Sequence, residues 1–176
     1  MLFINSVLKM KVIDNPAIDA FIENAIREDV GDGDHSALAC IPASAQGKAH
    51  LLVKEDGILA GVALAELIFK KVDPSFKLDI LLPDGSRVKK GDIAFYVTGP
   101  SQKLLTAERL VLNFMQRLSA IATQTNVYVK LLEGTNTKVL DTRKTTPGLR
   151  YLEKWAVALG GGYNHRIGLF DMIMLK

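Results

Sequence analysis

The sequence is poor in cysteine, histidine and aromatic residues, and it contains no long hydrophobic run. One cysteine, Cys40, stands among 176 residues. No disulfide framework can therefore form, and we expect a cytoplasmic protein. The three histidines and the cysteine show no zinc-type ligand spacing. No segment reaches the roughly 18 apolar residues that a membrane-spanning helix requires. We expect neither a metal held by protein ligands nor a membrane partner.

Positive charge is concentrated in the second part of the chain. Residues 1–102 carry 11 Lys and Arg against 14 Asp and Glu, whereas residues 103–176 carry 11 against 5. This asymmetry indicates an anionic partner, although solvated lysines also cluster without function. Aromatic residues amount to only 7%, and the basic residues fall at turns. Both observations argue against a nucleic-acid-binding module, which we keep as an alternative of a different class.

The first part of the chain predicts an α+β domain over residues 15–102. Residues 1–14 have no basic region and no cleavage site of the secretory type, so we interpret them as an N-terminal extension whose start is Met1 or Met10. Asn15-Pro16 predicts the start of a helix. Strands are expected on both sides of Glu55-Asp56-Gly57 and in FKLDIL and IAFYVTG, with a helix over residues 63–72.

The second part predicts a long helix followed by a β-α-β unit. Ser101 is expected to cap the helix and Gly134 to end it, with a break near Thr123 as an alternative. We treat residues 103–134 as a helical connector. Strand (137–140), helix (149–159) and strand (171–175) then follow within residues 135–176, which implies parallel strands. Two strands cannot complete a parallel sheet, so we expect a domain that stops partway through its fold.

Basic side chains follow the ends of these strands. Arg143 and Lys144 come after the first strand, His165 and Arg166 follow three glycines, and Lys176 ends the second strand. Because functional groups gather at the carboxyl ends of parallel strands, we expect these side chains to meet at one mouth. Guanidinium groups match carboxylates and ammonium groups suit phosphates. The sequence therefore predicts a ligand with several carboxylates or phosphates.

Simpler interpretations of the same residues stay open at this point. Arg143 can form a surface ion pair with Asp141, which would contribute little to stability. His165 can be a packed histidine, and Arg109, on the long helix, can lie on a solvated face or in a salt bridge. The run Gly160-Gly161-Gly162 lacks the spacing of a phosphate-binding loop and can be only a helix stop.

Three segments together resemble one family. AERLVLNFMQRLSAIAT (107–123), VLDTRKTTPGLRYLEKWAVALGGGYNHRIGLFDMIMLK (139–176) and the early EDVGDGDHS are similar to quinolinate phosphoribosyltransferases, and the similarity runs from about Asn15 to the last residue. The resemblance implies an α/β sandwich domain followed by the start of an α/β barrel of TIM-like type, here truncated. It implies phosphoribosyl transfer from 5-phosphoribosyl-1-pyrophosphate to quinolinate with decarboxylation, giving nicotinate mononucleotide, pyrophosphate and CO2 in NAD biosynthesis. Mg2+ accompanies the pyrophosphate, and the enzymes form homodimers or larger assemblies of dimers.

The resemblance also assigns roles to individual positions. It implies that Lys144 is catalytic and lies between the two substrates, and that Arg109 reaches the site of a neighbouring subunit. The other quinolinate contacts that it implies are Thr142, Arg143, His165, Arg166 and Lys176.

Members of this family continue beyond the position of Lys176, with strands that carry acidic and glycine-rich phosphoribosyl contacts. We therefore expect this 176-residue chain alone to be inactive or nearly so. A molybdate-linked phosphoribosyltransferase paralogue and a non-catalytic dimerisation fragment are alternatives. The joint presence of Arg109, Arg143, His165 and Arg166 favours the quinolinate enzyme over the paralogue.

Overall fold

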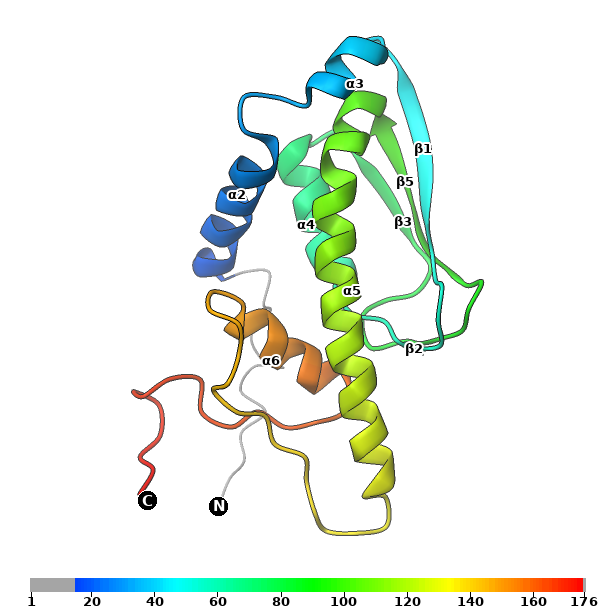
Figure 1. The fold of residues 1–176 in the computed structure, drawn as a ribbon. Coiled ribbons are helices and arrows are strands. Elements are labelled where there is room, and N and C mark those ends of the chain that lie inside the picture. Colours follow the sequence, from blue (N-terminus) through cyan, green and yellow to red (C-terminus); the bar gives the residue numbers. More distant parts are fainter. Residues whose placement is uncertain (1–14, 176) are drawn as a thin grey trace.

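The computed structural model describes residues 15–175 of the chain (Figure 1). The N-terminal extension expected over residues 1–14 and the predicted ligand contact of Lys176 lie outside the described residues. The helices are α2 (Pro16–Val30), α3 (His35–Cys40), α4 (Val62–Val72), α5 (Ser101–Leu131) and α6 (Arg150–Leu159). The strands are β1 (Gln46–Leu52), β2 (Gly57–Ile58), β3 (Lys77–Ile80), β4 (Arg87–Val88) and β5 (Ile93–Pro100). None of the helices in this range combines the length and the hydropathy needed to cross a bilayer.

An antiparallel sheet with the order β1-β5-β3 forms one layer of the first part of the chain. The helices α4 and α5 lie against one side of this sheet (Figure 1). Phe95 and Val97 of β5 share one face because side chains alternate along a strand, and both are buried. Between them, Tyr96 points the other way and lies under the ammonium group of Lys48. The predicted strand in FKLDIL begins at Lys77, one residue after the buried Phe76.

The helix α4 begins at a carboxylate from a distant turn. Asp84 accepts hydrogen bonds from the backbone N–H groups of Gly61 (2.5 Å), Val62 (2.9 Å) and Ala63 (2.9 Å). The first turn of a helix leaves such donors without partners inside the helix, so Asp84 satisfies them. Burial raises the pKa of Asp84, and the three N–H donors act against that rise.

The helix α5 is a single unbroken helix of 31 residues, so the alternative of a break near Thr123 is wrong. Instead, Thr123 Oγ1 accepts a hydrogen bond of 2.9 Å from Ile58 N, and one turn earlier Ser119 Oγ bonds both the N–H (3.0 Å) and the carbonyl (3.1 Å) of Ala60. The prediction that Ser101 caps the helix is also wrong. Ser101 is the first helical residue, and Pro100 precedes it without a side-chain cap.

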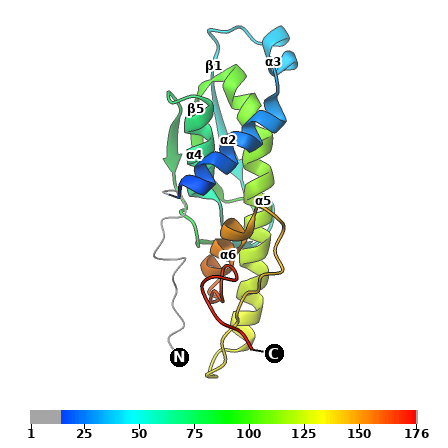
Figure 2. The same cartoon turned by 90° about the vertical axis from the view of Figure 1, so that its left-hand side faces the viewer.

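The β-α-β unit is present in a shorter form than predicted. A parallel bridge joins Leu140 to Tyr163, with Tyr163 N donating to Val139 O (2.9 Å) and Asp141 N donating to Tyr163 O (3.1 Å). The strand predicted over residues 137–140 is reduced to this bridge. The strand predicted over residues 171–175 is wrong: this segment is irregular and passes α6 away from the sheet (Figures 1 and 2), and Ile173 is 91% exposed. It has no strand partner among residues 15–175, and an unpartnered strand leaves its backbone groups and apolar side chains uncovered.

The three glycines after α6 stop the helix and also bring it close to α5. A Cβ atom on Gly160 would lie 2.3 Å from the carbonyl oxygen of Ala122, which leaves no room for a side chain. Asn126 Nδ2 donates to the carbonyl of Gly160 at 3.2 Å. Gly161 has a φ of +90°, a conformation that favours glycine. The interpretation of these residues as only a helix stop is therefore incomplete.

Candidate functional site

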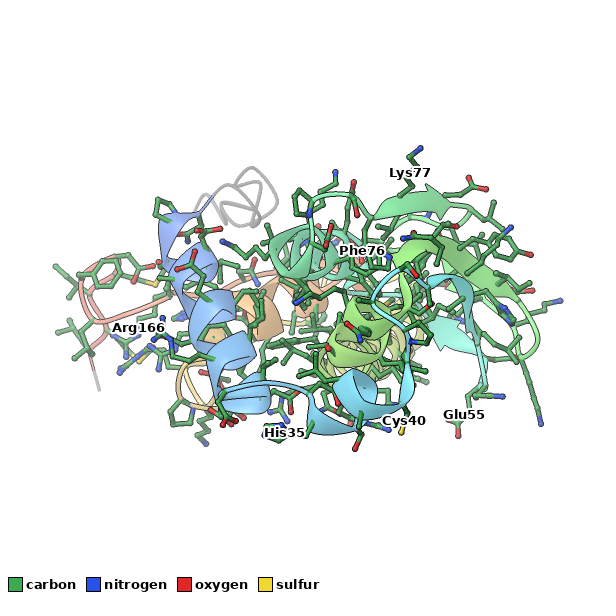
Figure 3. The ribbon with its side chains drawn as sticks, turned by 90° about the horizontal axis from the view of Figure 1, so that it is seen from above. His35, Cys40, Glu55, Phe76, Lys77 and Arg166 are labelled. Atoms are coloured by element: carbon green, nitrogen blue, oxygen red, sulfur yellow. The ribbon has the colours of Figure 1, made fainter. Side chains whose placement is uncertain are left out.

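A pocket of about 300 Å³ lies where the chain leaves the parallel bridge at both Leu140 and Tyr163. Four of the side chains expected at a ligand site come together here, from two segments that follow parallel strand positions. The described residues that line the pocket are Leu140, Asp141, Thr142, Arg143, His165, Arg166 and Met174. Figure 3 shows Arg166 far across the molecule from Lys77 and Glu55, so the pocket lies away from the sheet. The structure thus brings Arg143, His165 and Arg166, three of the side chains expected at one mouth, to the same pocket.

Behind this pocket, the Asp141 carboxylate is held by a network that the sequence did not suggest. Asp141 pairs with the ammonium group of Lys154 and accepts hydrogen bonds from Asn164 Nδ2 (2.6 Å) and His165 N (2.8 Å). Lys154 Nζ also donates to the carbonyl of His165 at 3.1 Å. The side chains of Lys154 and Asp141 are 0% and 6% exposed. The network therefore fixes both segments that supply the pocket cations.

Arg143 does not pair with Asp141, so the interpretation of these two residues as a surface ion pair is wrong. No ion pair joins them in the described range, because Lys154 takes the Asp141 carboxylate. Arg143 Nε is buried and has no hydrogen-bond partner among residues 15–175. A buried guanidinium N–H without a partner is costly, and no acceptor among residues 15–175 offsets that cost for Arg143.

The loop that carries Arg143 is fixed at several points. Thr142 Oγ1 accepts a hydrogen bond of 3.0 Å from Lys144 N, and Arg150 Nε donates to Thr145 Oγ1 at 3.1 Å. Arg117 of α5 contacts Thr146 and donates from Nε to Glu153 Oε1 at 2.9 Å. These contacts join the loop to both α5 and α6, and so they restrict the positions available to the pocket side chains.

Arg166 is held only weakly within the described chain. Its guanidinium group lies 3.5 Å from the carbonyl of Met172 and 3.7 Å from Met174 Sδ. The following loop is closed by Asp171, which accepts hydrogen bonds from Ile167 N (2.7 Å) and Gly168 N (2.9 Å). Partial desolvation raises the pKa of Asp171, but these N–H donors and the charge of Lys154 together lower it below its usual value. Arg166 thus keeps donors available to a ligand.

The remaining predicted site residues lie elsewhere. Lys144 and Arg109 are both exposed, neither lines the pocket, and neither forms an ion pair in the part of the chain that the structure describes. Arg109 therefore has no salt-bridge partner among residues 15–175. The contact of Arg109 with a neighbouring subunit stays a prediction. Lys154 and Asn164 were missed as site residues because helical periodicity cannot show that a lysine is buried. Their position within the EKWAV and YNHR blocks was the only signal.

The described residues do not form a metal site. Between residues 15 and 175, no three His, Cys, Asp or Glu side chains lie close enough together to hold a metal ion. The Mg2+ that the resemblance implies therefore finds no set of protein ligands in this part of the chain.

Several solved structures have a fold that closely matches this chain. NadC from Streptococcus pyogenes matches with a TM-score of 0.87 and 44% identity over 90% of this chain and 56% of that protein. The nicotinate-nucleotide pyrophosphorylase from Francisella tularensis matches with a TM-score of 0.84 and 38% identity, covering 89% of this chain and 56% of that protein. Human nicotinic acid phosphoribosyltransferase shares the fold alone, at 17% identity and a TM-score of 0.58, covering 73% of this chain and 34% of that one. The fold class is that of NadC and the nicotinate-nucleotide pyrophosphorylases.

The chain belongs to the quinolinate phosphoribosyltransferase family. The family model described as "Quinolinate phosphoribosyl transferase, N-terminal domain" matches residues 34–119, and the corresponding C-terminal domain model matches residues 121–176. Quinolinate phosphoribosyltransferase [decarboxylating] 1b of Nicotiana tabacum is 51% identical over 156 residues, which are 88% of this chain and 44% of that protein. The chloroplastic nicotinate-nucleotide pyrophosphorylase [carboxylating] of Oryza sativa is 50% identical over 160 residues, 90% of this chain and 43% of that protein. The chain spans about half the length of the curated relatives it matches.

Proposed function

We propose that this chain supplies the quinolinate-binding part of a decarboxylating phosphoribosyltransferase. The observation that carries the proposal is the pocket that contains Arg143, His165 and Arg166 and leaves Arg143 Nε without a partner. The overall reaction joins quinolinate to C1 of 5-phosphoribosyl-1-pyrophosphate and releases pyrophosphate and CO2. The product is nicotinate mononucleotide, a precursor of NAD. The family membership and the names of the relatives support this choice of reaction.

The chemistry of the pocket suits a pyridine dicarboxylate. Two guanidinium groups, on Arg143 and Arg166, can each face one carboxylate as a planar fork, while Thr142 and His165 can donate further hydrogen bonds. Fixed cations also stabilise negative charge that develops on a leaving pyrophosphate, a role that we propose for the exposed Lys144. Loss of CO2 leaves a carbanion that the glycosylated, cationic ring nitrogen stabilises, and this carbon then takes a proton from water to give the product. The reaction therefore requires no covalent nucleophile from the protein.

The larger architecture is part of the proposal. We infer that residues 139–165 begin a barrel of TIM-like type and that the preceding layers form a sandwich domain. A homodimer, or a larger assembly of dimers, would let the exposed Arg109 reach a neighbour's pocket. Mg2+ would arrive with the pyrophosphate of the donor substrate, since the described residues offer it no ligand cluster. The 176-residue chain alone would show little or no turnover. A cytoplasmic location stays a prediction, because some relatives are named as chloroplastic or mitochondrial.

Isothermal titration of the chain with quinolinate tests the proposal. Quinolinate should bind at least about tenfold more tightly than nicotinate, which lacks one carboxylate and so leaves one guanidinium fork without a charge-assisted hydrogen bond. Arg143→Gln should remove this preference. Arg87→Gln is a matched control because Arg87 is an exposed arginine of β4, outside the pocket.

Two results would count against quinolinate as the ligand. Equal binding of the two pyridine acids by the unaltered chain would mean that the pocket does not distinguish a second carboxylate. No binding at all, with Arg143 intact, would favour the molybdate-linked paralogue.

A further inference from the structure

One residue that lines the pocket, Asp141, carries a carboxylate that could compete with a ligand if it were released. Among the described lining residues, Asp141 is the one acid, and Arg143, Arg166 and His165 are the cationic or ionisable bases. Asp141 stands only two residues before Arg143 in the same loop. A carboxylate attached to the site is present at high effective concentration. It would therefore compete strongly for Arg143 if it were free to turn toward it.

Lys154 prevents this competition by occupying Asp141 from behind. It comes from the middle of α6, is fully buried, and forms an ion pair with the Asp141 carboxylate. Asn164 Nδ2 and His165 N fill further acceptor positions of the same carboxylate, at 2.6 and 2.8 Å. Arg143 Nε meanwhile stays buried without a partner. Lys154 thus holds the Asp141 carboxylate, and Arg143 is left without an ion-pair partner among the described residues.

We propose that Lys154 is a positioning residue that reserves Arg143 for an external carboxylate by holding Asp141 in a separate, neutral pair. The inference rests on the proposed function, because it takes quinolinate as the external anion. Lys154 itself does not line the pocket, so its effect reaches the ligand through Asp141 and Arg143. A purely structural lysine would stabilise the fold but would not determine the partner of Arg143.

The test compares Lys154→Met with the double variant Lys154→Met/Asp141→Asn. In the single variant Asp141 loses its cation and pairs with Arg143, so quinolinate affinity should fall at least about tenfold, the value of one charge-assisted hydrogen bond. The double variant removes the competing charge and should recover affinity to within about threefold of the unaltered chain. Replacement of a buried ion pair by a neutral pair of similar volume is generally tolerated, so the double variant should fold.

The side-chain N–H resonance of Arg143 gives a readout that a structural role would not change. In the unaltered chain, the Arg143 Nε–H signal should move on addition of quinolinate. In Lys154→Met it should already be displaced without ligand and should respond less to quinolinate. Lys138→Met removes the same charge from an exposed lysine outside this pocket, and it should leave both the resonance and the affinity unchanged.

The possible failures can be distinguished. If the unaltered chain does not bind quinolinate, the proposed function fails. If it binds and Lys154→Met binds equally well, the role of Lys154 is overturned while the function stands. If the single variant does not fold, two other measurements still test the role of Lys154. An Arg143 resonance that does not respond to quinolinate in the unaltered chain, or a double variant that folds without binding, each contradicts the inference.

Discussion

The regions before and after residue 120 each hold an aspartate carboxylate in a set of hydrogen bonds, and they do so by different means. Asp84 lies at the start of α4 and accepts three backbone N–H groups. Asp141 accepts one backbone N–H group and two side-chain donors, one of which is the charged Lys154. The first arrangement caps a helix. The second joins a loop, a helix and a second strand position around a pocket.

Because of this difference, Asp84 contributes to the fold alone, whereas Asp141 contributes to both the fold and the pocket. Backbone donors at a helix end are present whenever the helix forms, so Asp84 depends on local structure. The Asp141 network depends on side chains that lie 13 and 23 positions later in the chain, and it exists only once α6 is packed. A change to Asp84 should therefore alter stability alone, whereas a change to the Asp141 network should alter stability and ligand binding together.

The largest effect is expected for Asp141→Ala. This change leaves the Lys154 ammonium group buried without a counter-ion, which costs about 4 kcal/mol of the free energy of unfolding. Urea denaturation followed by circular dichroism measures it. Addition of Lys154→Met should recover most of the loss. A single variant as stable as the unaltered chain would show that water reaches Lys154.

Asp84→Ala should cost about 3 kcal/mol, because three N–H groups at the start of α4 lose their acceptor. Quinolinate affinity of the folded protein should stay within about twofold, since Asp84 is outside the pocket. Urea denaturation and titration measure the two quantities. Asp79→Ala, at an exposed position of β3, is the control and should change stability by less than about 0.5 kcal/mol. A loss of binding in the Asp84 variant would break the contrast between the two aspartates.

Gly160→Ala tests the contact between the two regions. The added Cβ would meet the carbonyl oxygen of Ala122 at 2.3 Å, so α6 must move away from α5 at a cost of about 2 kcal/mol. Because α6 carries Lys154, quinolinate affinity should fall as well. Gly91→Ala has no neighbouring atom within 4 Å and adds the same methyl group, although its φ of +98° makes it a strained control. Unchanged affinity in Gly160→Ala would separate α6 packing from the pocket.

The smallest effect is expected for the partly exposed ion pairs of Lys71, in contrast with the buried pair of Lys154 and Asp141. Hydrogen bonds to Asp19 and then Glu23 raise the pKa of Lys71 above its ordinary value of 10.5. The stabilisation is therefore complete below that value and is lost as the pH rises through the higher value of the folded state. Lys71→Met should cost about 0.5 kcal/mol near neutral pH, and the difference should shrink above about pH 11. Unfolding curves at both pH values measure it, with Lys54→Met as a control.

Much of the fold was predictable because it depends on local patterns. The start of α2 at Pro16 follows from its Asn15 cap, whereas the helix α4 and the length of α5 follow from apolar periodicity. The continuity of α5 at Thr123 was not predictable, because the hydroxyl bonds to Ile58, 65 positions away. The strand over residues 171–175 failed for a similar reason. A short run of apolar residues indicates that a segment can join a sheet, but not whether a partner strand is present.

The site was predictable in its residues but not in its connections. The cations of DTRK and NHR stand out as charges at strand ends, and the structure brings Arg143, His165 and Arg166 to one pocket. The sequence alone could not predict which cation pairs with Asp141. Arg143 is two positions away and Lys154 is 13, and only the packing of α6 decides between them. Buried polar networks are set by tertiary structure, and the sequence pattern around Lys154 is that of an ordinary amphipathic helix.

The continuity of α5 has a consequence for how the molecule unfolds. The two family domain models meet at residue 120, in the middle of this helix. At 1.5 Å per residue its 31 residues extend over about 46 Å, along the sheet at one end and α6 at the other (Figure 1). A hinge at the domain boundary would have to break helical hydrogen bonds. The two domains therefore share one mechanical element, and we expect a single cooperative unfolding transition rather than two.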